Sequence, residues 1–220
     1  MYKRQRLHIS LLILLCLVLA VSCARRPRST AEVPRSISST YKISVAPFTQ
    51  PTNASQLIVG RIPEEQGRIP ADMLPALDMK LREVLITGTK RQYTFIARQN
   101  LPPDLTTFHS SEQPQALPLW VAYGKKQGAQ LLLIPQVLDW HQREGSKAGV
   151  TESAHVRVEF FLLKVDDGTL MNRSIFEEKQ VGLTENLLTV GSFFKRRGTW
   201  VTAEDLTVDG MRKAVKDLGL

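Results

Sequence analysis

Cysteine is almost absent from this sequence of 220 residues, which contains only Cys16 and Cys23. Cys16 lies within an apolar run that we expect to be removed during export, so Cys23 would be the only thiol left. One thiol cannot form an internal disulfide and cannot build a zinc site from several cysteines. A disulfide-stabilised scaffold and a cysteine-based zinc module are therefore excluded.

Motifs of the common enzyme classes are also missing. The sequence has no His-Glu-x-x-His motif, no Gly-x-Ser-x-Gly nucleophile elbow and no glycine spacing of a phosphate-binding loop. The neighbouring acids Glu177 and Glu178 lie in a predicted strand, where adjacent side chains point to opposite faces and cannot act as a pair. These absences predict a protein that performs no catalysis and carries no cofactor.

Histidine is scarce as well. Beyond the amino-terminal apolar segment, only His109, His141 and His155 occur. His141 and His155 fall on neighbouring predicted strands near the connection between them, so their side chains could face each other. Two imidazoles without an accompanying carboxylate or thiol make a poor metal site. The sequence therefore predicts exposed strand histidines and no bound metal.

The amino terminus has the organisation of an export signal. Three basic residues, Lys3, Arg4 and Arg6, precede the apolar run LLILLCLVL, and small residues follow it. The apolar segment 7–21 is shorter than the about 20 residues that a membrane-spanning helix needs. This favours a cleaved signal peptide over a permanent membrane span.

The exit from this apolar run, Ala20-Val21-Ser22-Cys23, resembles the lipobox of bacterial lipoproteins. The resemblance implies a signal peptide over residues 1–22 and acylation of Cys23, with palmitate among the acyl chains. Several acyl chains give stable membrane attachment. A plain signal peptide with a chance cysteine is the other reading. Ala24 replaces the aspartate that often retains lipoproteins in the inner membrane, which favours the outer membrane.

The charge of the remaining chain restricts its partners. Removal of residues 1–22 takes away three basic residues and no acidic one, so the formal net charge falls from +8 to +5. A modest positive excess spread over the chain is typical of a solvated surface. Outside the cytoplasm it suits anionic headgroups or envelope polymers better than nucleic acid.

The chain beyond the signal divides into a tether and one domain. Residues 23–40 are polar, contain two prolines and show no periodicity, which predicts a disordered tether. A single domain should span residues 41–220. Its first half predicts, in order, a strand over 41–48, an irregular stretch over 49–69, a helix from Asp72 to Gly88, a strand over 93–97 and a helix over 117–126.

The second half of the domain predicts strands over 129–144, 153–165 and 169–181. Asp167-Gly168 indicates a two-residue hairpin turn between the last two strands. Thr202 and Asp205 form a capping-box pattern that begins a C-terminal helical extension. The predicted fold is α/β, a mixed sheet with a C-terminal antiparallel meander. Helices packed on the sheet, placed before the meander in the sequence, should cover one face.

An aromatic and basic segment stands out at residues 193–200. Its aromatic side chains flank three consecutive cations, and the candidate interaction surface comprises Phe193, Phe194, Lys195, Arg196, Arg197 and Trp200. Such a segment can dock on a partner or on an anionic membrane surface. The other reading is that the aromatic rings pack on the sheet while the cations are solvated.

Short motifs along the domain resemble a superfamily of envelope lipoproteins. The strand at 43–48, the helix end Gly128-Ala129-Gln130, the apolar strand at 131–137 and the strand end at 163–168 are similar to those of the curli-secretion superfamily. That superfamily includes lipoprotein activators of penicillin-binding proteins and the amino-terminal domain of the Tol translocation protein. The ending TENLLTVGSFFKRRGTWVTAEDL resembles a tail of deltaproteobacterial lipoproteins.

This resemblance implies the α/β fold and an assembly or regulatory role, without catalytic residues. Gln130 in place of aspartate and Pro135 in place of glycine depart from the pattern. The sequence thus predicts a lipid-anchored accessory protein of the cell envelope, facing the periplasm, that binds a protein or a glycan such as peptidoglycan. The alternative is an oligomeric subunit of an outer-membrane secretion or transport assembly.

Overall fold

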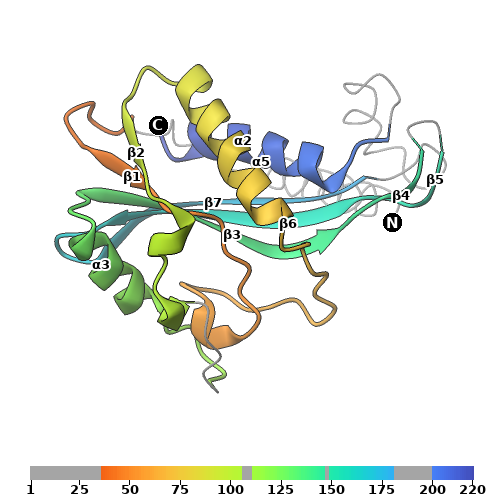
Figure 1. The fold of residues 1–220 in the computed structure, drawn as a ribbon, viewed down its shortest axis with the longest axis horizontal. Helices are drawn as coiled ribbons and strands as arrows, with labels where there is room; N and C mark the ends of the chain where they lie inside the picture. Colours follow the sequence, from red (N-terminus) through yellow and green to blue (C-terminus); the bar gives the residue numbers. More distant parts are fainter. Residues whose placement is uncertain (1–35, 106–110, 147–148, 181–199) are drawn as a thin grey trace, which may run out of the picture. The chain divides into compact units, whose positions relative to one another are not determined.

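The computed structural model describes residues 36–105, 111–146, 149–180 and 200–220. Its main feature is a five-stranded sheet with the order β2–β1–β3–β6–β7 (Figure 1). The strands are β1 (Ile43–Val45), β2 (Tyr93–Phe95), β3 (Leu131–His141), β6 (His155–Lys164) and β7 (Thr169–Lys179). β1 pairs in parallel with β2 and β3, whereas β3, β6 and β7 are antiparallel. The predicted α/β fold with a C-terminal antiparallel meander is confirmed.

Helices cover both faces of this sheet. α2 (Met73–Gly88) and α5 (Ala203–Asp217) pack side by side on one face, and α3 (Ala116–Lys126) lies on the other (Figure 1). Three short 3-10 helices, η1 (Ala54–Gln56), η2 (Arg98–Asn100) and η3 (Pro103–Leu105), lie in the connections. The expectation that the helices before the meander share one face is wrong. β3 is buried from Leu131 to Trp140, and a strand buried on both faces needs a cover on each.

The core under α2 and α5 follows the periodicity of the sequence. Leu77, Leu81 and Leu85 of α2 are fully or almost fully buried, as their spacing of four residues predicts. They meet the alternating face of β6 that carries the predicted residues Val156, Val158, Phe160 and Leu162. The predicted capping box of α5 is also present: the Thr202 side chain accepts from Asp205 N, and the Asp205 carboxylate accepts from Thr202 N.

The opposite core lies under α3. Trp120 and Tyr123 of α3 pack against the side chains of β3 and β6 that point away from α2, among them Leu132, Ile134 and Phe161. α3 ends near the predicted Gly128, which has φ +64° and so occupies the left-handed region that favours glycine. Alternate residues of β3 therefore serve two separate apolar clusters.

The connections between the meander strands differ from the prediction. β6 and β7 form the predicted hairpin, but Lys164 pairs with Thr169, so the turn has four residues instead of two. Gly168 in this turn has φ +72°. Between β3 and β6, a small separate sheet is formed by β4 (Glu144–Gly145) and β5 (Val150–Glu152).

Part of the predicted tether lies within the described residues. Ile37 N donates to Gly219 O at 2.9 Å, and the Ile37 side chain packs against the core below α2 and α5. The signal peptide and the rest of the tether lie outside the described residues, so these boundaries stay predictions. In the described ranges, no helix has both the length and the apolar character to cross a membrane.

Candidate functional site

A groove of about 780 Å³ lies between α2 and α5. α2 contributes Lys80, Glu83, Val84, Thr87 and Gly88 to its lining, and α5 contributes Glu204, Asp205, Val208, Asp209, Arg212, Val215 and Lys216. Arg143 and the residues that lead into α5, Trp200, Val201 and Thr202, complete it. We call this surface the helix groove.

The helix groove combines an apolar floor with balanced charge. Four valines line it, and all four also pack against the core: Val84, Val201, Val208 and Val215. Its charged lining consists of four cations and four acids, from Lys80 to Lys216. Two pairs neutralise each other on their own helices, Lys80 with Glu83 at 4.0 Å and Arg212 with Asp209 at 3.1 Å.

An exposed apolar ridge runs along α2, formed by two residues that do not themselves line the helix groove. Met79 is 68% exposed and Ile86 is 57% exposed, both on α2. Residues seven positions apart lie on nearly the same side of a helix, and Glu83 between them lines the groove. The sequence pattern of α2 did not single out these two residues because they do not belong to its buried stripe.

The structure places one of the six residues of the candidate interaction surface in this groove. Trp200 lines it, and the Trp200 carbonyl oxygen accepts from Arg143 Nη1 at 3.1 Å. The entry to α5 is further fixed because Val201 N donates to Gln180 Oε1 and Ala203 N donates to Gln142 Oε1. The lipidation residue Cys23 and the other surface residues Phe193, Phe194, Lys195, Arg196 and Arg197 lie outside the described residues.

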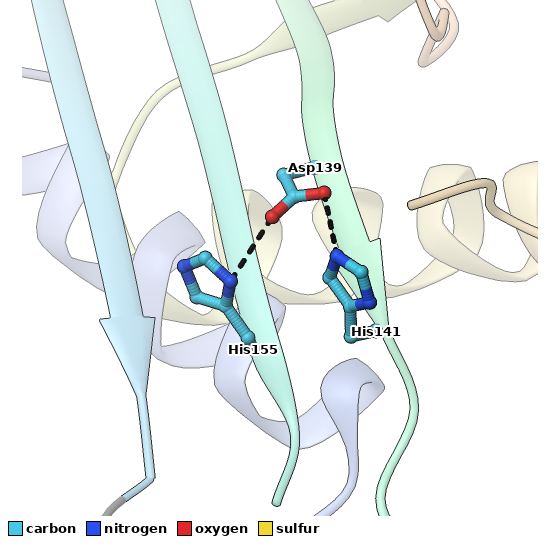
Figure 2. A group of neighbouring side chains, drawn as sticks. All are labelled: Asp139, His141 and His155. Atoms are coloured by element: carbon cyan, nitrogen blue, oxygen red, sulfur yellow. Dashed lines mark ion pairs between the residues drawn. The ribbon is translucent and has the colours of Figure 1, made fainter. Parts of the chain in front are cut away.

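A second candidate site lies on the opposite face of the sheet. Asp139 Oδ1 lies 3.1 Å from His141 Nε2, and Asp139 Oδ2 lies 3.0 Å from His155 Nδ1. Figure 2 shows one nitrogen of each imidazole turned toward the carboxylate. We call these three residues the histidine cluster. Asp139 is 3% exposed, whereas the side chains of His141 and His155 are 46% and 25% exposed.

The register of β3 and β6 creates this cluster. His141 and His155 are direct register partners with ring centroids 5.8 Å apart and planes 11° from parallel, so the prediction that they could face each other is confirmed. The premise that no carboxylate accompanies them is wrong. Asp139 and His141 are two residues apart on one strand and therefore share a face. The sequence did contain a signal for this site: an Asp-x-His pattern on one predicted strand and a histidine near the start of the next.

The backbone and side chains of the long loop 49–69 hold the buried carboxylate. Gly67 N donates to Asp139 Oδ1 at 2.7 Å, and Gln66 Nε2 donates to Leu138 O at 2.7 Å. A side chain at position 67 would collide with the carbonyl oxygen of Trp140, so glycine is required for this close approach. The loop therefore fixes the position of Asp139.

A charged network continues from the histidine cluster along the same face. His155 Nε2 lies 3.7 Å from Glu177 Oε1, and Glu177 Oε2 lies 3.5 Å from Arg157 Nη1. The fully buried Glu159 then accepts from Arg157 Nη2 at 3.2 Å and from Arg173 Nη2 at 2.6 Å. Each carboxylate of the network thus faces at least one cationic or imidazole group.

No protein-family model matches the sequence, and no curated protein resembles it significantly. Among solved structures, the dodecamer of a single-substitution variant of PelC from Paraburkholderia phytofirmans is similar, with 13% identity, a TM-score of 0.46 and coverage of 84% of this chain and 92% of that chain.

Two further structures are also similar. The LpoB C-terminal domain from Salmonella enterica has 13% identity, a TM-score of 0.35 and coverage of 66% and 87%. The lipoprotein GNA1162 from Neisseria meningitidis has 10% identity, a TM-score of 0.34 and coverage of 71% and 97%. At such identities the likeness concerns the arrangement of helices and strands alone.

Proposed function

We propose that this protein is a lipid-anchored, non-catalytic accessory protein of a bacterial cell envelope, and that the helix groove binds an amphipathic segment of a partner protein. The observation that carries the proposal is the groove itself, with its valine floor and the exposed ridge of Met79 and Ile86. Laying an apolar helical face into such a groove is a common mode of peptide recognition.

The charge balance of the groove supports a protein partner over a glycan or an anionic surface. Its lining carries as many carboxylates as cations, so a polyanion would meet repulsion as often as attraction. A polypeptide can carry both signs and can place apolar side chains on the valine floor. Of the two partner classes that the sequence left open, the groove fits a protein better.

The chemistry of the lining supports a binding role without catalysis. No histidine, cysteine, serine or tyrosine is among the described residues that line the groove. Three of its four acids serve the helices: Glu83 and Asp209 form ion pairs within α2 and α5, and Asp205 caps α5. The fourth acid, Glu204, has no histidine, cysteine, serine or tyrosine beside it among the described lining residues with which it could form a catalytic pair.

In this proposal, a lipid anchor on Cys23 attaches the protein to a membrane of the cell envelope. The basic start, the apolar run and the lipobox in the sequence support export and acylation, and Ala24 favours the outer membrane. The domain would then face the periplasm and meet its partner at the membrane surface. The aromatic and basic segment at residues 193–200 stays a predicted interaction surface, and Trp200 is its one residue that lines the groove.

Photocrosslinking in cells tests the groove directly. A photoreactive amino acid in place of Ile86 should give a covalent adduct of discrete mass. The same substitution at Ile175, which is 41% exposed on β7 and pairs with Glu159 on the other face, is the matched control and should not. Trp200→Ala should weaken the adduct at position 86.

The mass of the adduct separates the outcomes. A second protein that is found at position 86, and whose adduct is weakened by Trp200→Ala, supports the proposal. An adduct with another copy of this chain supports the alternative, an oligomeric subunit of a secretion or transport assembly. Equal crosslinking at positions 86 and 175 would mean that the groove is not a specific binding surface.

A further inference from the structure

The histidine cluster has the donor atoms and spacing of a metal site. One donor atom from each of Asp139, His141 and His155 can be chosen so that all three lie within 4.8 Å of one another. Bonds of about 2.0–2.1 Å to a tetrahedral zinc ion place neighbouring donor atoms about 3.4 Å apart. Asp139 Oδ1 lies 3.1 Å from His141 Nε2 and Asp139 Oδ2 lies 3.0 Å from His155 Nδ1, so each imidazole is already close to that spacing from one of the two carboxylate oxygens. Binding through a single oxygen requires the other imidazole to turn toward it.

We propose that Asp139, His141 and His155 bind a divalent transition-metal ion of the Zn²⁺ type. Two imidazole nitrogens and one carboxylate oxygen suit Zn²⁺ better than Mg²⁺ or Ca²⁺, which prefer oxygen ligands only. The nitrogens of His141 and His155 need to approach each other by at most about 1.4 Å to reach tetrahedral spacing. The 46% exposure of the His141 side chain leaves room for that rotation.

The scaffold around these donors is rigid. Two of them come from β3 and one from β6, at positions that the sheet register places opposite each other. Asp139 is nearly fully buried and is held by the Gly67 N–H group, which the loop 49–69 positions against Trp140. A site on paired strands with a fixed carboxylate loses little freedom when the ion binds.

A second carboxylate supports the orientation of His155. Its Nδ1 faces Asp139, and its other nitrogen, Nε2, lies 3.7 Å from Glu177 Oε1. A ligating histidine commonly points its second nitrogen at a carboxylate, which fixes the ring and raises its basicity. Arg157, 3.5 Å from Glu177, holds that carboxylate in place. Glu177 is therefore a positioning residue of the proposed site.

Three protein donors would leave one position of a tetrahedral ion for a further ligand. A water molecule or a group from a partner could take that position. The site lies on the face of the sheet opposite the helix groove, so the two are separate surfaces. Binding of the metal would stabilise the ends of β3 and β6 by mass action.

Zinc binding to the full-length protein, purified in detergent without a histidine tag, tests the proposal. Equilibrium dialysis with metal analysis should find one Zn²⁺ per chain. The double variant His141→Ala, His155→Ala should lower the affinity at least roughly tenfold, and His109→Ala is the matched control that should not. The thermal midpoint should rise with Zn²⁺ in the wild type and not in the double variant.

A milder variant and a spectroscopic probe distinguish loss of the metal site from misfolding of the double variant. Glu177→Gln, at a side chain that is 50% exposed, should keep the stoichiometry but weaken Zn²⁺ on the order of tenfold. Co²⁺ added in place of Zn²⁺ should give visible bands that the double variant lacks. The proposal would be overturned by a wild type that takes up no Zn²⁺, or by a double variant that binds Zn²⁺ as tightly as the wild type. The three residues would then form only the two contacts between Asp139 and the histidines.

Discussion

Asp167 shows how one turn residue links stability to pH. Its Oδ2 accepts from Lys164 Nζ at 2.6 Å, and its Oδ1 accepts from Thr169 N at 3.0 Å. The hydrogen bond from Lys164, followed by those from Thr169, lowers the pKa of Asp167 from 3.8 to about 2. Because the folded state has the lower pKa, the stabilisation by Asp167 is present above pH 3.8 and is lost as the pH falls toward 2.

Asp167→Asn should therefore lower stability at neutral pH and have a smaller effect in acid. Urea midpoints of wild type and variant should differ by a constant amount above about pH 5 and converge as the pH falls to about 2. Asp166→Asn is the neighbouring control, which leaves both hydrogen-bonded oxygens of Asp167 in place. A difference between wild type and Asp167→Asn that grows in acid would contradict this assignment.

Glu159 is a fully buried carboxylate between two arginines, Arg157 and Arg173. Glu159→Ala should destabilise the protein by roughly 3 kcal/mol, because removal of one partner leaves partly buried charge uncompensated. Glu177→Ala, at a half-exposed acid of the same network, should cost about 1 kcal/mol or less. Urea unfolding measures both, and equal losses would mean that burial does not set the cost.

At the scale of the elements, Gly210 allows α5 to lie close against β6 and β7. A Cβ atom there would lie 2.9 Å from the Phe176 ring and 3.0 Å from Val158 Cγ2. Gly210→Ala should destabilise by about 1–3 kcal/mol through overpacking, although alanine is the better helix former by about 1 kcal/mol. Gly88→Ala, at the end of α2 with no atom within 4 Å of the added Cβ, is the control.

Thermal unfolding should separate these two glycine variants, because only Gly210→Ala should lower the thermal midpoint. Gly88→Ala should leave the midpoint unchanged or raise it, because alanine restricts the unfolded chain and meets nothing in the folded one. Gly210→Ala should lower the midpoint by several degrees. A raised midpoint for Gly210→Ala would show that α5 can move away from β6 and β7 without cost.

Elements with local patterns were predictable, and their arrangement across the sheet was not. The leucines of α2, the alternation of β6 and the capping box of α5 each follow from a short stretch of sequence. The apolar start of β3 is buried on both faces, so its sequence gives no sign of which helix covers which face. The four-residue turn at Asp167 depends on the pairing of Lys164 with Thr169, which composition does not specify.

The two candidate sites illustrate the same limit of local patterns. Trp200 was predicted as part of an interaction surface from its neighbours in the sequence. The helix groove was not predicted, because α2 and α5 are far apart in the sequence and meet only in the fold. Asp139 faces His155 only through the β3–β6 register, which shifts between Val137 and Asp139. Composition near each histidine could not reveal that shift.

At the scale of the whole molecule, the proposed function needs the anchor and the groove together. A single groove of this size binds a short segment weakly unless the two proteins are held close. A lipid on Cys23 would confine the domain to the membrane surface and raise the effective concentration of a partner there. Loss of the anchor and loss of the groove should therefore both reduce binding, but through different steps.

Cys23→Ala and Trp200→Ala separate these steps. Cys23→Ala should shift the protein from the membrane fraction to the soluble periplasmic fraction or leave a larger precursor. It should also lower crosslinking at position 86, and overexpression of the released protein should partly restore that crosslinking because it raises concentration. Trp200→Ala should leave the membrane fraction unchanged and lower crosslinking at any expression level, because it alters the groove itself. Unchanged membrane attachment and unchanged mature mass of Cys23→Ala would show that this cysteine does not anchor the protein.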